Sequence, residues 1–168
     1  EQALESPMRY PGDLLQPEDR TRLARSIKGY DISPDMVRLS LVNLYLHGFA
    51  DPKVEEYDTL TSEDKWTEMA DVILANPPFN ISDWGGERLR EDARWKYGIP
   101  PAGNANFAWL QHMLARLSSR GRAGIVLANG SMSSTQSGEG EIRRGMVQGD
   151  VVECMVALPG QLFSNTQI

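Results

Sequence analysis

The tetrapeptide Asn76-Pro77-Pro78-Phe79 directly follows the apolar run 71–75, which reads Asp-Val-Ile-Leu-Ala. Apolar and β-branched residues ended by two prolines predict a buried parallel strand that opens into a rigid loop. The carboxyl ends of parallel strands form the ligand crevice of open α/β sheets. There, the Asn76 side chain and the Pro77 carbonyl can accept hydrogen bonds from an exocyclic amine, and Phe79 offers a stacking face to a planar base. A proline-terminated strand beside an unrelated aromatic residue is the competing interpretation.

The elements that must position this loop alternate along the chain, which predicts a parallel sheet with helices on its faces. Strands are expected at residues 27–32, 53–58, 71–75, 123–128 and 151–157. Helices are expected at 17–27, from the Ser33 cap to Gly48, from 107 to Gly121 and at 141–147, with a Ser- and Gly-rich loop at 129–140.

Composition limits the classes of protein that this chain can belong to. Its 168 residues are 40% hydrophobic and 24% charged, which is typical of a globular domain or part of one. We find neither a signal peptide nor an apolar stretch of membrane-spanning length, which predicts a soluble cytoplasmic protein that makes no membrane contact. The net charge of -6 argues against unaided binding to nucleic acid, because phosphate contacts require basic residues.

Neither a metal site nor a nucleophilic cysteine is expected. His47 and His112 are far apart in sequence and have no Cys partners at ligand spacing. We expect His112 at the surface or boundary of its helix. The single cysteine, Cys154, lies within the apolar run 151–157 and is expected to be a buried structural thiol.

The segment 83–97 combines aromatic and basic side chains, namely Trp84, Trp95 and Tyr97 with Arg88, Arg90, Arg94 and Lys96. Such interleaving is typical of loops that stack bases or contact phosphates. Four acidic residues lie in the same segment. A solvated loop with internal salt bridges is therefore an equally good interpretation.

The chain resembles the modification (methylase) subunit of type I restriction-modification systems, a DNA adenine-N6 methyltransferase that uses S-adenosylmethionine. The similarity covers about residues 15–168 and follows the family's order of motifs. Besides the tetrapeptide, the resembling stretches are 29–34, 43–48, 57–60, 94–98, 121–130 and 158–163. Most of these stretches are weak signals alone, but their order makes the match specific.

The resemblance implies that residues 1–168 form part of an S-adenosylmethionine-dependent catalytic domain with a Rossmann-like, mostly parallel sheet and helices on both faces. The family's glycine-rich cofactor loop, of the type Asp-Pro-x-x-Gly-x-Gly, follows its first strand, and nothing like it precedes Asp31. We therefore expect the chain to lack that strand, which in this fold lies between strands 27–32 and 71–75. An unpaired strand edge and poor cofactor binding by the chain alone should result.

By the resemblance, the catalytic residues are Asn76, Pro77, Pro78 and Phe79, and the cofactor-binding residues are Asp31, Ile32, Asp58 and Thr59. Asp31 would accept hydrogen bonds from the ribose hydroxyls, and Asp58 would lie near the adenine ring. Each of these residues has an alternative role. Asp31 also suits the first turn of the following helix, Asp58 an ordinary turn, and Ile32 the core.

The activity implied is methyl transfer from S-adenosylmethionine to an adenine flipped out of duplex DNA. The partners implied are duplex DNA, a specificity subunit that reads the bases, and a restriction (motor-nuclease) subunit. Two alternatives stay open. One is a protein-glutamine or RNA amino-methyltransferase, in which the aromatic after Asn-Pro-Pro is usually Tyr. The other is a non-catalytic methylase remnant that acts as an assembly module.

Overall fold

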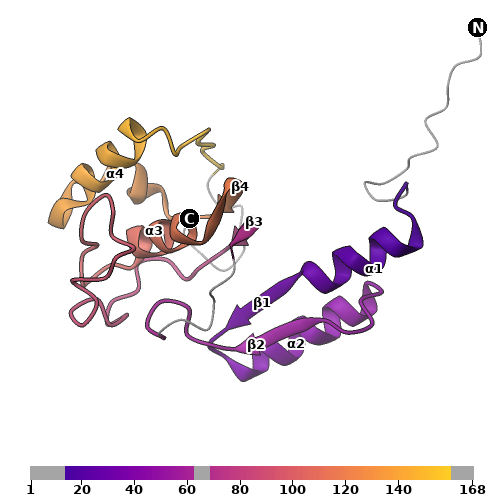
Figure 1. Ribbon diagram of the computed structural model, residues 1–168. Coiled ribbons are helices and arrows are strands. Elements are labelled where there is room, and N and C mark those ends of the chain that lie inside the picture. The colour runs from indigo at the N-terminus through magenta and orange to yellow at the C-terminus, as the bar shows by residue number, and fades with distance from the viewer. Residues whose placement is uncertain (1–13, 63–68, 160–168) are drawn as a thin grey trace, which may run out of the picture. The chain divides into compact units, whose positions relative to one another are not determined.

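The computed structural model describes residues 14–62 and 69–159. Two compact units divide the chain, Glu1–Thr59 and Leu60–Ile168 (Figure 1). The described strands form two separate parallel pairs, one within each unit. The α/β class and the parallel pairing expected from the sequence are thus confirmed, as small sheets of two strands each.

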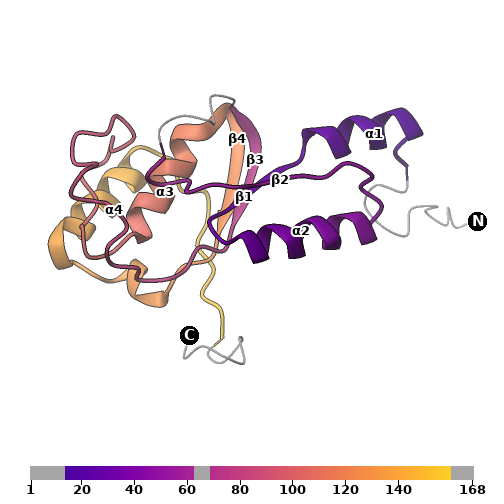
Figure 2. The same cartoon turned by 90° about the horizontal axis from the view of Figure 1, so that it is seen from below.

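The first unit is a β-α-β arrangement preceded by a helix. It contains α1 (Pro17–Ser26), β1 (Lys28–Asp31), α2 (Pro34–Leu46) and β2 (Lys53–Glu56). Parallel neighbours need a crossover connection, and α2 provides it, packing along both strands (Figures 1 and 2). The register runs from Lys28 opposite Lys53 to Asp31 opposite Glu56.

The ends of α2 lie where the sequence places them. The Ser33 hydroxyl accepts a hydrogen bond from the Met36 amide at 3.4 Å and caps the helix, with Pro34 as its first residue. At the other end, Gly48 adopts a φ of 88°, a left-handed conformation that glycine takes without a steric penalty. Local capping chemistry therefore accounts for both helix boundaries.

The second unit contains β3 (Ala70–Ala75), α3 (Asn106–Arg116), β4 (Leu117–Ile125), the 3-10 turns η1 (Asn129–Met132) and η2 (Gln136–Gly138), and α4 (Glu139–Gln148). Strands β3 and β4 are parallel, with Val72 opposite Arg122 and Ala75 opposite Ile125. Helix α3 packs against β4 (Figure 2). It also supplies buried core residues, among them Phe107 and Ala108, at 2% and 0% exposed.

The boundary between α3 and β4 differs from the sequence prediction. We expected the helix to continue to Gly121 and the strand to occupy 123–128, but the backbone becomes extended at Leu117. Gly121 lies within β4, where a Cβ atom would stand 2.8 Å from the Ala70 carbonyl oxygen. The glycine thus serves close strand packing rather than helix termination.

Two predictions of burial were wrong. In β3 only Ile73 is buried, whereas Val72 and Leu74 are 67% and 81% exposed, because a two-stranded sheet covered by one helix leaves its other face open.

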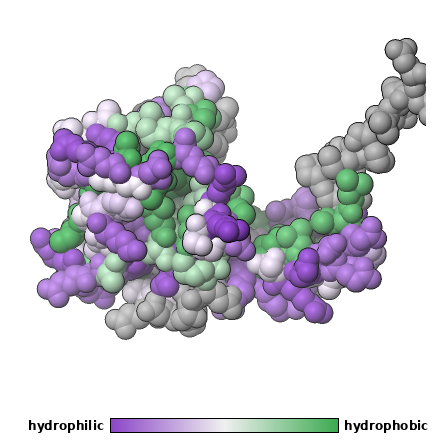
Figure 3. Space-filling model, turned by 45° about the horizontal axis from the view of Figure 1, so that its top comes forward, coloured by the Kyte–Doolittle hydropathy of each residue, from purple (hydrophilic) through white to green (hydrophobic). Residues whose placement is uncertain are grey.

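Residues 151–157 form no strand, since they pair with no other strand in the described parts of the chain. Cys154 is accordingly exposed. Figure 3 shows such apolar surface, in green, in both units.

No helix within residues 14–62 and 69–159 is both long and apolar enough to cross a membrane. The resembling stretch 158–163 lies mostly outside the described residues.

Candidate functional site

The tetrapeptide leaves the β3–β4 sheet at its carboxyl end, as predicted. The ladder continues to the last residue of β3, because the Val126 amide donates to the Ala75 carbonyl at 3.1 Å. Pro77 and Pro78 have no N–H groups and cannot extend the pairing. Asn76 is exposed, Pro77 is buried and Phe79 is half-buried. The loop therefore presents an amide to solvent and leaves part of its aromatic side chain accessible.

The turn after Phe79 is held by residues that the sequence analysis missed. Asn80 has a φ of 54°, in the left-handed region. Its amide donates to Asn106 Oδ1 at 3.1 Å, and its Oδ1 accepts from Asn106 Nδ2 at 2.9 Å. Asn106 Nδ2 also donates to Ser131 Oγ at 3.1 Å. The signal in the sequence is a polar residue at the start of a helix whose next four residues, 107–110, are apolar.

A polar hollow of about 520 Å³ lies beside Asn80. Amide, hydroxyl and carboxyl side chains line most of it, from Asn80, Asn104, Asn106, Ser131, Ser133, Ser134, Thr135, Gln136 and Glu139. Glu139 is 3% exposed, and its Oε1 has no hydrogen-bond partner in the described parts of the chain. A hollow of this composition suits a neutral, hydrogen-bonding ligand group better than a phosphate, which the carboxylate would repel.

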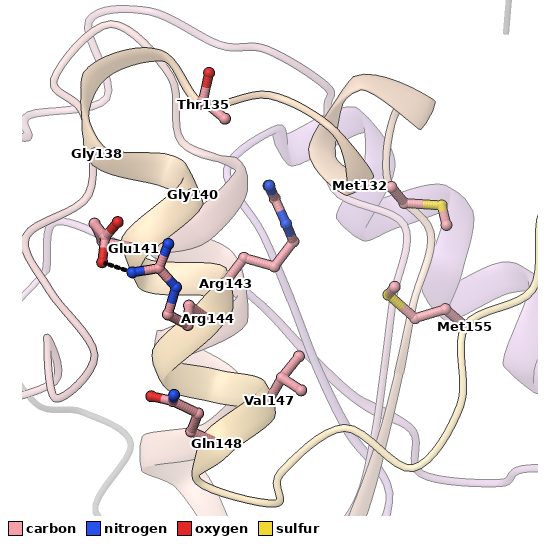
Figure 4. A pocket seen from close by; sticks show the side chains of 10 residues that line it. All are labelled: Met132, Thr135, Gly138, Gly140, Glu141, Arg143, Arg144, Val147, Gln148 and Met155. Carbon is pink, nitrogen blue, oxygen red and sulfur yellow. Dashed lines mark hydrogen bonds and ion pairs between the residues drawn. The ribbon is translucent and has the colours of Figure 1, made fainter.

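A second hollow, of about 530 Å³, lies along α4 (Figure 4). Arg143 reaches across it from α4, and its Nη1 donates to the carbonyls of Ser131 and Ser134 at 3.3 and 2.8 Å. On the same helix, Arg144 forms an ion pair with Glu141 at 2.8 Å (Figure 4). None of the predicted site residues lines this hollow.

The four predicted cofactor residues lie together at the carboxyl ends of β1 and β2. The Tyr57 amide donates to the Asp31 carbonyl at 2.9 Å, so Asp58 and Thr59 follow directly after the last rung of the ladder. Asp31 Oδ1 accepts from the Ser33 amide at 2.8 Å, which is the turn role weighed in the sequence analysis.

Its neighbour Ile32 is 68% exposed and is not a core residue. This edge of the first unit thus combines a carboxylate that is already oriented with an adjacent apolar surface. Both are features that an adenosine group requires, since it offers ribose hydroxyls and a flat apolar ring.

The segment 83–97 is not a stacking surface. Trp84 and Trp95 are 6% and 8% exposed and pack edge to face with ring centroids 6.0 Å apart. The indole N–H of Trp84 donates to the Pro101 carbonyl at 3.1 Å, and that of Trp95 donates to the Leu89 carbonyl. Both rings therefore belong to the core of the second unit, which excludes them from base stacking.

Arg94 links this segment to α3 instead of contacting phosphate. It forms an ion pair with Asp92 at 2.6 Å and donates to the Leu60 carbonyl and to His112 Nδ1, both at 2.8 Å. An arginine can only donate, so Nδ1 is the acceptor and the imidazole proton resides on Nε2.

His112 is 4% exposed, so the surface or boundary position expected for it is wrong. Burial, followed by the charges of Arg94 and Arg116, lowers the pKa of His112 from 6.5 to about 4. The hydrogen bond from Arg94 lowers the pKa of Asp92 below 3.8. The cluster of Arg94, Asp92 and His112 therefore has a structural role, joining the segment 83–97 to α3, and its histidine is neutral. Metal-ligating side chains do not gather in threes anywhere in residues 14–62 and 69–159.

Comparison with known proteins gives consistent matches. The family model described as N-6 DNA Methylase matches residues 12–168. The type I restriction enzyme HindI methylase subunit of Haemophilus influenzae is 49% identical over 145 residues, which cover 85% of this chain and 32% of that protein. The MjaIX methylase subunit of Methanocaldococcus jannaschii is 38% identical over 150 residues, covering 85% and 26%.

A solved structure, that of the type I restriction-modification system methyltransferase subunit from Streptococcus thermophilus, matches with a TM-score of 0.75 and 26% identity. The match covers 84% of this chain and 31% of that one. The chain thus spans about a third, or less, of the length of these relatives.

Proposed function

Because this chain belongs to the N-6 DNA methylase family, we propose that it is part of a type I restriction-modification methylase subunit that methylates adenine N6 in duplex DNA. The observation that carries the proposal is the exposed Asn76 amide at the carboxyl end of β3, followed by two prolines and a half-buried aromatic ring. The substrate adenine is flipped out of the duplex, because a base within the stack is inaccessible.

Two hydrogen-bond acceptors of the loop hold the adenine amine. The Asn76 side-chain oxygen and the Pro77 carbonyl each accept one N–H of the adenine amine, which directs the nitrogen lone pair away from the loop. S-adenosylmethionine, when bound, supplies the electrophilic methyl group. The amine nitrogen, held by the loop, would take the methyl group while the cofactor sulfur keeps the electron pair of its bond to carbon, and the nitrogen would release its surplus proton to solvent. Positioning therefore contributes most of the acceleration, and no general base is needed.

Phe79 supplies the platform for the flipped base. The accessible part of its side chain can stack on adenine, an interaction worth about 1–3 kcal/mol per base. A phenylalanine rather than a tyrosine at this position favours a DNA substrate over the protein-glutamine and RNA alternatives.

We assign the cofactor to Asp31, Ile32, Asp58 and Thr59. The bond from the Ser33 amide fixes Asp31 Oδ1, so that Oδ2 is oriented to accept from the ribose hydroxyls. The exposed Ile32 side chain would pack against the adenine ring, with Asp58 and Thr59 beside it. In the complete protein we propose one Rossmann-like, mostly parallel sheet with helices on both faces. Its first strand and glycine-rich loop are not found in these 168 residues.

The assembly proposed includes duplex DNA, a specificity subunit that selects the sequence, and a restriction (motor-nuclease) subunit. The net charge of -6 on these 168 residues supports this division, because most of the phosphate contacts would then come from other parts of the assembly.

The test is Asn76→Ala in the complete protein with its specificity subunit. We expect loss of methyl transfer to DNA, while the Kd for S-adenosylmethionine stays within a few-fold, because Asn76 faces the amine and not the ribose. Asn43→Ala, an exposed change on α2, is the matched control. Full activity of Asn76→Ala would refute the assignment. Labelled methyl transfer to RNA or protein but not to DNA would favour the alternative enzymes, and no transfer at all would favour the remnant.

A further inference from the structure

We propose that Asn106 is a positioning residue for the methyl-transfer loop. Its buried amide holds Asn80 in the left-handed conformation and so fixes where Asn76 and Phe79 lie. The inference rests on the proposed function, because it concerns the same loop. Asn106 itself does not contact the reacting groups, so it acts through Asn80.

Two hydrogen bonds between Asn106 and Asn80 form a reciprocal clamp. Asn106 Oδ1 accepts from the Asn80 backbone and Asn106 Nδ2 donates to the Asn80 side chain, at 3.1 and 2.9 Å. Rotating the Asn106 amide by half a turn would oppose donor to donor and acceptor to acceptor, so only one orientation satisfies both bonds. The clamp is needed because L residues adopt positive φ with difficulty, although asparagine tolerates it better than most.

The clamp is anchored in the buried core of the second unit. Asn106 is 2% exposed and is followed in α3 by the buried core residues Phe107 and Ala108. Its Nδ2 also donates to Ser131 Oγ, and the Ser131 carbonyl in turn accepts from Arg143 of α4. The turn after the tetrapeptide is therefore connected to α3, η1 and α4 together.

A shift at Asn80 would reach the reacting groups because the chain between them is stiff. Pro77 and Pro78 each have a fixed φ, which leaves few soft torsions in the loop. The loop is pinned at its start by the bond from the Val126 amide to Ala75. Its second pin is Asn106, supplemented by the bond from the Ala105 amide to the Ile81 carbonyl at 3.1 Å and by Asn104 Nδ2, which donates to Asn80 Oδ1 at 3.4 Å. Loss of the second pin would displace Asn76 relative to the methyl donor, and a displacement of about 1 Å can cost roughly 100-fold in rate.

The variant that tests the clamp is Asn106→Asp in the complete protein with its specificity subunit. The substitution keeps the shape and the Oδ1 acceptor, but at pH 8 it replaces the Nδ2 donor with a carboxylate oxygen that faces Asn80 Oδ1. We expect kcat for DNA methylation to fall by about 100-fold, with the Kd for S-adenosylmethionine unchanged.

Burial at position 106 raises the pKa of a carboxyl group. Lowering the pH should therefore protonate the new carboxyl group and restore a donor, so kcat relative to wild type should rise as the pH falls. A purely structural role would not produce this pH profile. Asn43→Asp, an exposed change on α2, is the control and should show neither effect.

Hydrogen exchange of residues 76–81 provides a readout that does not depend on activity. It should become faster in Asn106→Asp at pH 8, while exchange within α3 stays slow. If wild type does not methylate DNA but the exchange result holds, the proposed function fails and the clamp stands. Unchanged exchange together with unchanged kcat would overturn the clamp.

A second pair of variants serves if Asn106→Asp does not fold. Both variants lose the side-chain half of the clamp, but Asn80→Gly should retain more of kcat, because glycine adopts positive φ and keeps the backbone N–H that reaches Asn106. Asn80→Val should lose kcat strongly, because a β-branched residue resists that conformation. Equal activity of the two variants would also overturn the proposal.

Discussion

Replacing His112 should change how the stability of α3 depends on pH. Burial in the second unit, followed by the cations Arg94 and Arg116, lowers the pKa of His112 from 6.5 to about 4. A histidine with a lowered pKa in the folded state leaves stability unaffected above pH 6.5. As the pH falls below 6.5, the unfolded chain binds the proton more readily, and the folded state loses stability until the pH reaches about 4.

The difference between the two pKa values corresponds to roughly 3 kcal/mol. At pH 5 about 2 kcal/mol of it is already lost. Because His112 is 4% exposed, solvent screening does not reduce the effect substantially. Asp92 does not contribute in this window. Its pKa is lowered below 3.8, so the stability it provides is lost only as the pH falls through that lower value.

The assay is hydrogen exchange of α3 in the complete protein at pH 7.5 and pH 5.0, corrected for the intrinsic exchange rate at each pH. Wild type should lose about 2 kcal/mol of opening free energy between the two pH values. In His112→Asn, whose amide oxygen can still accept from Arg94, this loss should be absent. His47→Asn, at the exposed end of α2, is the control. An equal loss in wild type and His112→Asn would refute the reasoning.

Three further predictions concern the proposed site. Phe79→Ala should weaken binding of DNA with a mismatched target adenine by about 1–3 kcal/mol in a fluorescence titration, whereas Phe79→Trp should preserve this affinity. If both variants bind such DNA as tightly as wild type, Phe79 is a core residue and not a stacking platform. Asp31→Ala should raise the Kd for S-adenosylmethionine by roughly 10- to 100-fold in calorimetry, because it removes hydrogen bonds to a charged acceptor that are worth about 1.5–3 kcal/mol. The control Asp35→Ala should leave this Kd unchanged. Equal affinities of the two variants would contradict the ribose assignment. The 168-residue chain alone should show no saturable S-adenosylmethionine binding, while a longer chain that includes a glycine-rich loop should bind it; tight binding by the short chain would mean that its own residues complete the cofactor site.

The parts of the fold that depend on local chemistry could be predicted from the sequence. The boundaries of α2 follow from Ser33, Pro34 and Gly48, each of which acts on its immediate backbone neighbours. The tetrapeptide is likewise found at a strand end, because two prolines stop strand pairing wherever they occur.

The parts that depend on distant residues could not be predicted in this way. An apolar run such as 151–157 becomes a strand only where another strand pairs with it, and the run itself does not contain that information. Trp84 and Trp95 lie among basic residues in the sequence, and this pattern does not distinguish tryptophans that stack on bases from tryptophans that pack in the core. Asn106 is distinguished only by Asn80 and Ser131, which lie 26 and 25 residues away along the chain.

The hydrogen bonds of Arg94 also have a consequence for the order in which the chain folds during synthesis. The β1–α2–β2 arrangement needs only residues that leave the ribosome early, so we expect it to form while translation continues. The second unit has to wait, because Arg94 joins the carbonyl of Leu60 to His112 within α3. Until that helix emerges, the indole rings of Trp84 and Trp95 have no core to enter, and the nascent chain at this stage is the form best suited to recognition by chaperones.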